Sequence, residues 1–495
     1  NHIRWSGNNE ISLQEAQMRT FSNFAWMFLR TEGDYNFSSG SRGRGNLSST
    51  ANPYFLFPQI YNFRYNIYSS EWPVANRAIE LYLQKKSENE GWERQINGLS
   101  NNEKANLLLE KHTFKELLAD VEQRNLQNNI VGLEASRLFA RSEINMGVDA
   151  FRDSLYAMLK RNTFLNIKFE NMLDTLGEMS RTDLYSYLKE WEQLTPLPFY
   201  SIGEPELTKV VNKGGEEFFV LKVLVSNNSD YDGIIQMNVL QNGWWYQPME
   251  DPRARKKVEI AAHTSKEFVS VWEEQIRDVE INTMVSGNLP YMIRQSIGNV
   301  KQERNKIVKD TIYTLPESSL EMPGEVIVDN EDSTLFVLST PAVVGLLPKW
   351  LDKVEDTSFK YSGISWWRAP LQWTATTNAK YYGKYIRSAY VIKSGDGSQT
   401  ATWKIPVPEA GQYELYYHVF KDDELRWNDR LQGEYHFRVA YDSEMEDAYI
   451  NLRKANEGWE QLGTYYFSAD TVRVVLTDEC KLRSVTADAV KIVKR

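Results

Sequence analysis

The fold of the last third of the chain is decided by the stretch Thr400-Ala-Thr-Trp-Lys-Ile-Pro-Val-Pro-Glu-Ala-Gly-Gln-Tyr-Glu-Leu-Tyr-Tyr-His-Val419. Apolar and polar side chains alternate from Thr400 to Val407 and again from Tyr413 to Val419. Alternation with a period of two is typical of strands that bury one face. Pro408-Glu-Ala-Gly411 separates the two runs and is typical of a turn. The stretch therefore predicts two strands with a turn between them.

Similar strand patterns continue on both sides of this stretch. They occur at residues 325–328, 435–439, 464–467, 472–476 and 489–493. Strands at this spacing, with Gly and Asp turns between them, are typical of β-sandwiches and jelly rolls. We therefore expect residues 325–495 to form a C-terminal β jelly roll.

The preceding segment also has the period of strands. Phe218 to Val225 is a short apolar run that ends in the turn-forming residues Asn227-Asn-Ser-Asp230, a pattern typical of a strand and its turn. Residues 199–310 therefore predict a central β-sandwich. Residues 311–324 contain Pro316, Pro323 and Gly324 and are predicted to form a linker.

The first part of the chain has the period of helices. Ser100-Asn-Asn-Glu103 has the spacing of a capping box, in which each side chain bonds the other residue's backbone N–H. The segment from Asp183 to Trp191 is predicted to be a helix that ends before Pro196, because the residue before a proline is disfavoured in the α region. We expect a helical domain over 1–198, so the predicted fold class is multidomain α+β, with an N-terminal α-helical domain, a central β-sandwich and a C-terminal β jelly roll.

Charge and composition exclude several classes of partner. The 495 residues carry a net charge of -10, which argues against nucleic acid, because attraction to phosphate supplies most of that affinity. The most apolar stretch, 335–351, is interrupted by two prolines and a lysine and is too short to span a bilayer. We expect a soluble chain. Because it begins at Asn1 without a signal-peptide pattern, we expect a processed chain or an excised fragment, with a membrane anchor upstream as one alternative.

The sequence lacks the familiar catalytic motifs. None of its five histidines lies in His-Glu-x-x-His, and neither a Gly-x-Ser-x-Gly elbow nor a phosphate-binding loop is present. The single cysteine, Cys480, excludes a disulfide within the chain. No catalytic, cofactor-binding or metal-binding residue is predicted. A structural calcium is the one open alternative, at Asp329, Asp332 and Asp488, which lie near the first and last strands of the predicted jelly roll.

Aromatic side chains are the strongest candidates for a binding site. Aromatic residues make up 13% of the chain, and their rings offer a flat apolar face that suits the C–H face of a sugar. The alternative is that these rings fill the core of the jelly roll. The candidate ligand-binding residues are Trp366, Trp367, Trp373, Tyr381, Tyr382 and Trp427, with Trp459 in a later predicted loop.

The last domain resembles the golvesin C-terminal-like domain, also called the xanthan-lyase carbohydrate-binding-like domain. The matching motifs are Val326-Ile-Val-Asp-Asn-Glu-Asp332, Gly395-Asp-Gly-Ser-Gln-Thr-Ala-Thr-Trp403, Val407-Pro-Glu-Ala-Gly-Gln-Tyr-Glu-Leu-Tyr416, Gly458-Trp-Glu-Gln-Leu-Gly-Thr-Tyr-Tyr-Phe467 and Ala487-Asp-Ala-Val490. The resemblance implies a jelly roll attached to a bacterial extracytoplasmic protein, and it implies binding of sugar.

The first 310 residues resemble the C-terminal part of M1-type (gluzincin) peptidases. The matching segments are Gly147-Val-Asp-Ala-Phe-Arg-Asp-Ser-Leu-Tyr156, Phe169 to Leu176, and Asp183 to Trp191 followed by Leu197-Pro-Phe199. The zinc motif of that family is absent. We therefore expect a non-catalytic extracytoplasmic protein of the bacterial envelope, in the periplasm or at the cell surface, that binds a polysaccharide or an envelope protein through its jelly roll. The alternatives are the C-terminal fragment of a zinc metallopeptidase whose catalytic half lies upstream, and a polysaccharide lyase or hydrolase.

Overall fold

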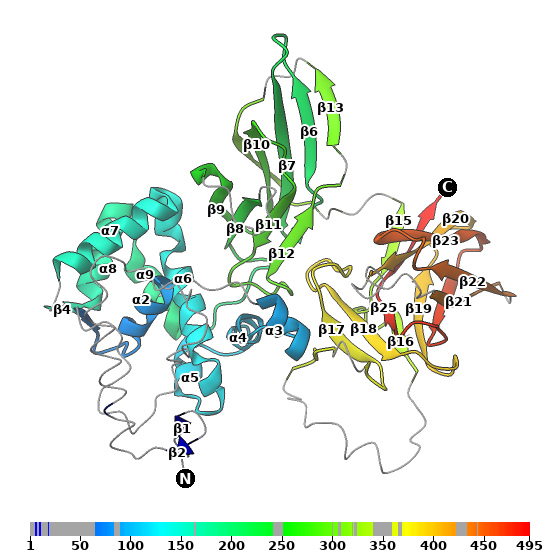
Figure 1. Cartoon of the computed structure of the whole chain (residues 1–495), viewed down its shortest axis with the longest axis horizontal. Helices are drawn as coiled ribbons and strands as arrows, with labels where there is room; N and C mark the ends of the chain where they lie inside the picture. The colour runs from blue at the N-terminus through cyan, green and yellow to red at the C-terminus, as the bar shows by residue number, and fades with distance from the viewer. Residues whose placement is uncertain are drawn as a thin grey trace. The chain divides into compact units, whose positions relative to one another are not determined.

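A computed structural model describes most of the chain. The described residues are 5–6, 9–10, 18, 65–83, 90–162, 165–240, 251–298, 300–304, 308–318, 320, 324–339, 359–364, 369–421, 433–442 and 444–495. The chain divides into two compact units, one of residues 1–88 and 108–195 and the other of residues 89–107 and 196–495. Figure 1 labels their elements, and each unit is described by itself.

The first unit is helical. Its helices are α2 (Ala75–Leu83), α5 (Phe114–Ala119), α6 (Gln127–Met146), α7 (Val148–Arg161), α8 (Phe169–Ser180) and α9 (Leu184–Lys189), with the 3₁₀ turns η1 (Glu122–Asn125) and η2 (Glu190–Glu192). Its short strands are β1 (Trp5–Ser6), paired with β2 (Asn9–Glu10), and β3 (Tyr65–Tyr68), paired in parallel with β4 (Leu165–Lys168). Helix α6 packs against α2, α7 and α8, and the rings of Phe139, Phe151, Phe169 and Trp191 are fully buried. The predicted helix after Asp183 is confirmed, and the Asp183 carboxylate caps it by accepting the N–H of Ser186 at 3.1 Å.

The predicted capping box at Ser100 is also confirmed, but its helix lies in the second unit. Helices α3 (Glu90–Asn97) and α4 (Asn101–Leu109) meet at this point, where the Ser100 N–H donates to Glu103 at 2.7 Å and the Glu103 N–H donates to Ser100 Oγ at 3.3 Å. Asn102 donates to the hydroxyl of Tyr291 at 3.0 Å. Residues 89–107, which sequence reasoning places in the helical domain, thus pack with the β-rich unit instead.

Two sheets form the central β-sandwich. The first has the order β13 (Val300–Arg304), β6 (Glu206–Val211), β7 (Glu217–Asn227), β10 (Thr264–Trp272) and β14 (Thr311–Pro316), with β5 (Tyr200–Ile202) paired to β7. The second has the order β12 (Met292–Ser296), β11 (Asp278–Asn282), β8 (Gly233–Leu240) and β9 (Arg255–Ile260), which follows the 3₁₀ turn η3 (Pro252–Ala254). The predicted linker differs from the structure at residues 311–316, which form an edge strand on β10. Pro316 ends that strand, where a missing N–H is tolerated.

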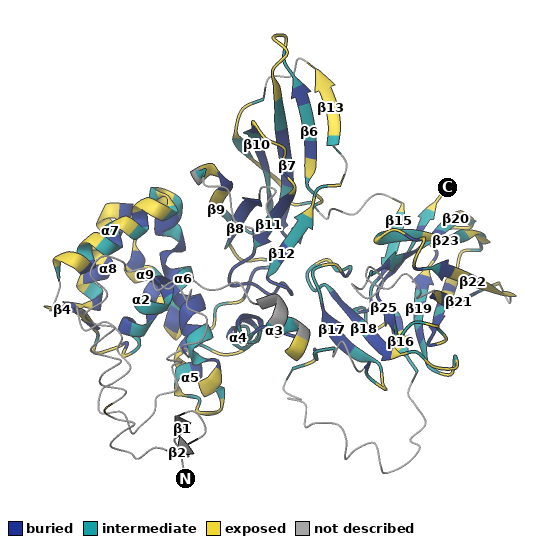
Figure 2. Cartoon of the chain, viewed as in Figure 1, coloured by how far each residue is buried: buried dark blue, intermediate teal, exposed yellow. Residues whose placement is uncertain are grey.

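Three sheets form the C-terminal domain. Their orders are β15 (Glu325–Val328), β26 (Val490–Lys494), β20 (Gly411–Val419) and β23 (Gly458–Phe467); then β16 (Phe336–Leu338), β19 (Thr400–Pro406), β24 (Thr471–Thr477), β21 (Glu434–Tyr441) and β22 (Glu444–Asn451); and β17 (Thr374–Thr377), β18 (Ser388–Lys393) and β25 (Ser484–Ala487). The predicted strands at 400–407 and 413–419 are present as β19 and β20, in different sheets. Their inward rings, among them Trp403 and Tyr417, are fully buried. Figure 2 colours each element by the burial of its residues. The predicted fold class is therefore confirmed.

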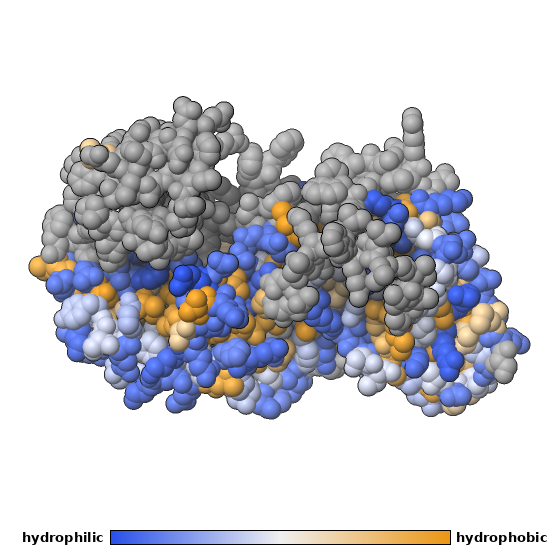
Figure 3. All heavy atoms as spheres, turned by 90° about the horizontal axis from the view of Figure 1, so that it is seen from below, coloured by the Kyte–Doolittle hydropathy of each residue, from blue (hydrophilic) through white to orange (hydrophobic). Residues whose placement is uncertain are grey.

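The described surface is of mixed polarity. On the face in Figure 3, hydrophobic residues are interspersed with hydrophilic ones. Among the described helices, none is both long enough and apolar enough to cross a membrane.

Candidate functional site

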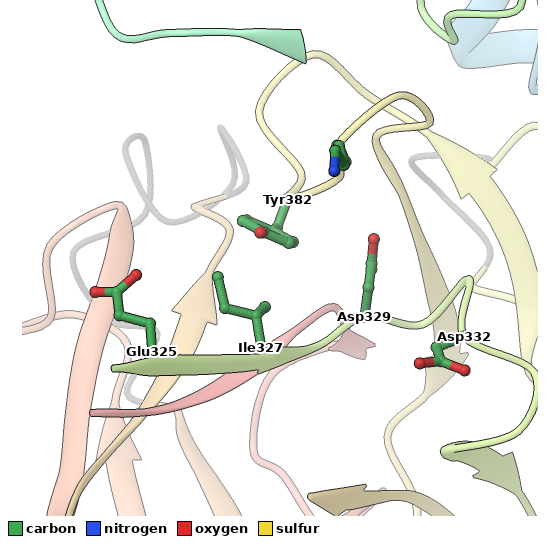
Figure 4. A pocket seen from close by; sticks show the side chains of 6 residues that line it. Glu325, Ile327, Asp329, Asp332 and Tyr382 are labelled. Atoms are coloured by element: carbon green, nitrogen blue, oxygen red, sulfur yellow. The ribbon is translucent and has the colours of Figure 1, made fainter. Parts of the chain in front are cut away.

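A pocket of about 200 Å³ opens beside the first strand of the C-terminal domain. Alternate residues of a strand share a face, so Glu325 and Ile327 of β15 point the same way as Asp329, which directly follows the strand. Figure 4 shows Ile327 rising toward Tyr382, which belongs to the loop between β17 and β18, with Glu325 and Asp329 on either side of Ile327. The lining residues are Glu325, Ile327, Asp329, Asp332, Tyr382 and Lys384.

Three aromatic rings pack together at one side of this pocket. The Tyr382 ring centre lies 5.0 Å from that of Trp459 and 5.8 Å from that of His418, and the last two rings meet edge to face at 5.1 Å. His418 on β20 and Trp459 on β23 are register partners on the solvent side of the sheet, because their neighbours Tyr417 and Val419 point into the core. We call Tyr382, His418 and Trp459 the aromatic wall.

The ammonium group of Lys491 contacts both the aromatic wall and strand β15. Nζ of Lys491 lies 4.9 Å from the ring centre of Trp459 and 2.9 Å from the carboxylate of Glu325. Both partners of this ion pair are mostly buried, with exposed side-chain fractions of 13% and 16%. The pair therefore neutralises Glu325 and fixes the position of the Trp459 ring at the same time.

Asp488 supports the aromatic wall from below. Its fully buried carboxylate accepts the backbone N–H of Tyr382, at 3.2 Å to each oxygen, and lies 2.9 Å from Nδ1 of His418. Its backbone carbonyl accepts the indole N–H of Trp403 at 3.2 Å, which ties the site to the core. Burial raises the pKa of Asp488, while the charge of His418 and its hydrogen bond act in the opposite direction.

Asp329 is the second carboxyl group with an altered pKa at this site. Burial raises the pKa of Asp329 well above its usual value, and repulsion from Asp488 adds to that shift. Hydrogen bonds from the backbone N–H groups of Asn330, at 2.6 Å, and Glu331 oppose the shift. Two carboxyl groups in different environments therefore lie close together beside an aromatic wall, an arrangement suited to hydrogen-bonding a polar ligand.

The predicted aromatic residues have different places in the structure. Tyr382 lines the pocket, whereas Trp373 packs against the core of the domain. Tyr381 is only 6% exposed and packs on Phe420 at 4.7 Å, so burial leaves it without the free ring face that a sugar platform requires. The remaining three candidates lie outside the described residues: Trp366, Trp367 and Trp427.

Sequence reasoning did not select His418 as a site residue, and it placed Trp459 in a loop instead of strand β23. The alternation of side chains through Tyr417 and Val419 could have predicted that His418 lies on the solvent side of its strand. Of the three carboxylates proposed for calcium, Asp329 and Asp332 line the pocket and Asp488 lies beneath Tyr382. In the described part of the chain, no group of three or more His, Cys, Asp or Glu side chains is arranged to hold a metal ion. Calcium at these residues stays a prediction.

Comparison with known proteins identifies the C-terminal segment. Residues 367–494 match the Golvesin C-terminal domain family, and this range contains the whole aromatic wall and Asp488. The resemblance stated from sequence is thereby confirmed for this part, whereas the resemblance to M1-type peptidases stays a prediction. No curated protein matches the chain.

Solved structures with some similarity include two carbohydrate-related proteins. The CBM35 from Cellvibrio japonicus Abf62 is 12% identical with a TM-score of 0.18, and the match covers 26% of this chain and 90% of that one. A β-glucuronidase of Bacteroides uniformis is 12% identical with a TM-score of 0.19, and the match covers 64% of this chain and 32% of that one. The chain thus spans about a third of the length of that enzyme.

Proposed function

We propose that this chain is a non-catalytic, extracytoplasmic protein of the bacterial envelope that binds glycan at the pocket between Tyr382 and β15. The observation that carries the proposal is the aromatic wall next to a pocket lined by carboxylates and a lysine. The match to the Golvesin C-terminal domain supports it. The alternative within this proposal is that the C-terminal domain binds an envelope protein instead of a glycan.

The chemistry of the pocket fits one end of a sugar chain. A pyranose presents a C–H face that packs on an aromatic ring, and its hydroxyl groups bond to carboxylates and amines. The pocket of about 200 Å³ is smaller than the roughly 300–1,000 Å³ typical of sites for drug-sized ligands. We therefore expect one or two sugar units to be held, with modest affinity at a single site.

Retention on polysaccharides tests the proposal. The full chain is run by affinity electrophoresis through gels that contain a panel of neutral, acidic and amino polysaccharides. Tyr382→Ala and Trp459→Ala should each weaken retention at least about tenfold, which is about 1.4 kcal/mol. The matched control is Tyr466→Ala, since Tyr466 is 61% exposed on the same strand as Trp459 but pairs with Gln412 at the other end of β23. Equal retention of all three variants and the wild type would contradict the proposal.

A polysaccharide lyase or hydrolase is the second candidate. One observation favours it, namely that Asp329 and Asp488 are neighbouring carboxyl groups with raised pKa values, and such pairs serve as acid and base in glycosidases. Incubation of the chain with the retained polysaccharide distinguishes the two candidates. New reducing ends or unsaturated products that disappear in Asp329→Asn would establish the enzyme, and an unchanged polymer would leave binding as the function.

A further inference from the structure

We propose that the pocket is selective for glycans that carry a protonated amino group, meaning hexosamine units without an N-acetyl group, with Asp329 as the counter-charge of the ammonium. This inference rests on the proposed glycan binding and names its ligand class. Its basis is the distribution of charge around the pocket, combined with the ring of Tyr382.

Most charges around the pocket already have partners. Glu325 is paired with Lys491 at 2.9 Å, and Asp488 lies against His418 at 2.9 Å. Asp332 accepts the hydroxyl of its neighbour Thr334 at 2.8 Å in a local turn. These side chains can shape a ligand site, but their interactions are largely satisfied within the protein.

Asp329 differs from the other carboxylates of the pocket. Its hydrogen bonds come from backbone N–H groups and from the side-chain amide of Asn330, which are all neutral donors, and within the described residues no lysine, arginine or histidine forms an ion pair with it. The charged groups with the largest effect on its pKa are Asp488 and Glu331, and both are acidic. A positively charged ligand group would favour the ionised form of Asp329 and replace this repulsion with attraction in a half-buried site, where charges interact more strongly than in water.

The ring of Tyr382 points to an organic cation. Tyr382 lines the same pocket as Asp329, and Figure 4 shows Asp329 rising from the end of β15 to one side of Tyr382. An ammonium group is attracted both to a carboxylate and to the face of an aromatic ring. The amino group of a sugar can therefore interact with both the Asp329 carboxylate and the Tyr382 ring, and the sugar ring that carries it can lie against the aromatic wall.

The same charges disfavour acidic sugars. A uronate would bring a further negative charge next to Asp329 and Asp332, at a site where Asp329 is already repelled by its neighbours. Among the described residues that line the pocket, Lys384 is the one cation, but it also acts on Glu317 and lies 5.5 Å from the ring centre of Tyr385. Its charge is therefore shared with groups outside the pocket.

Calorimetry on the full chain tests the selectivity. The probes are a fully de-N-acetylated glucosamine oligomer and the N-acetylated oligomer of the same length, at pH 6. The amine form should bind at least about tenfold more tightly, and its affinity should fall as salt rises, because salt screens charge attraction. Asp329→Asn should bring the two affinities to within about threefold. This variant keeps the side-chain size and an oxygen that accepts the Asn330 N–H, so hydrogen exchange should show an unchanged fold.

The control is Glu434→Gln, which removes the same charge from an exposed position on the other sheet and should leave both affinities unchanged. Equal affinity for the two oligomers, tighter binding of the acetylated one, or no binding of either would overturn the selectivity. Titration with Ca²⁺ alone covers the metal alternative, since binding that is lost in Asp329→Asn would assign the pocket to the metal and also overturn it. If the amine preference fails while Tyr382→Ala still weakens retention on a neutral polysaccharide, the glycan site itself stands.

Discussion

Replacement of Asp488 tests which has the larger effect on the stability of the C-terminal domain, the cost of burying its carboxylate or the attraction between that carboxylate and His418. The carboxylate is fully buried and serves the N–H of Tyr382 and the ring of His418. Asp488→Ala leaves both groups without an acceptor, and an unsatisfied buried group costs roughly 1–3 kcal/mol. We therefore expect Asp488→Ala to lower the unfolding free energy of the C-terminal domain by about 3 kcal/mol.

Asp488→Asn should cost much less. The amide oxygen still accepts the Tyr382 N–H, and the amide nitrogen lies in place of the carboxylate oxygen next to Nδ1 of His418. The variant also removes a buried charge, and burial is the largest cause of the raised pKa of Asp488. We expect a loss below about 1 kcal/mol at pH 7, since exchange of one neutral hydrogen bond for another is worth roughly that much.

The pH dependence has a defined sign. Because the pKa of Asp488 is higher in the folded chain than its ordinary value of 3.8, the folded state binds the proton more tightly than the unfolded state does. The corresponding stabilisation is fully present below pH 3.8 and is lost as pH rises through the folded pKa. In Asp488→Asn, the unfolding free energy should therefore depend less on pH between pH 3.8 and the folded pKa of Asp488.

Hydrogen exchange measured by mass spectrometry on peptides from β20 and β26 reports the unfolding of this domain within the full chain. Glu434→Gln is the control and should change stability by less than about 0.5 kcal/mol, as exposed substitutions usually do. The reasoning fails if Asp488→Asn costs as much as Asp488→Ala, because attraction between Asp488 and His418 would then outweigh the cost of burial.

Two further predictions concern the rest of the β-rich unit. Hydrogen bonds to Asp230 and Glu317 raise the pKa of His263 above 6.5. The stabilisation from these bonds is therefore fully present below pH 6.5 and is lost as pH rises through the folded pKa. In urea unfolding, His263→Gln should be more destabilising at pH 5.5 than at pH 8.5, and an equal effect at both pH values would contradict this. Gly98 has a φ of +79° and its added Cβ would lie 2.3–2.6 Å from backbone atoms of Ser362, so Gly98→Ala should cost at least about 1–3 kcal/mol through backbone strain. Faster hydrogen exchange in residues 359–364 would show that cost, and unchanged exchange would refute it.

The local patterns of the sequence determined which segments form helices and strands and which faces they bury. The alternation at 400–419 correctly places Trp403 and Tyr417 in the core, because side chains of a strand point to opposite faces in turn. The capping box of α4 was also predicted from the sequence, since a cap needs only a polar side chain within a few positions of the helix start. These features depend on neighbours in the chain.

Only the tertiary structure decided what these elements meet. Strands β19 and β20 follow each other in sequence but join different sheets, because pairing depends on how the whole set of strands closes around one core. The same long-range packing brings Asp329 to Asp488, buries Tyr381 and leaves the neighbouring Tyr382 in the pocket. Adjacent aromatic residues in a loop have no period that assigns their faces, so the division between core ring and site ring arises from the fold.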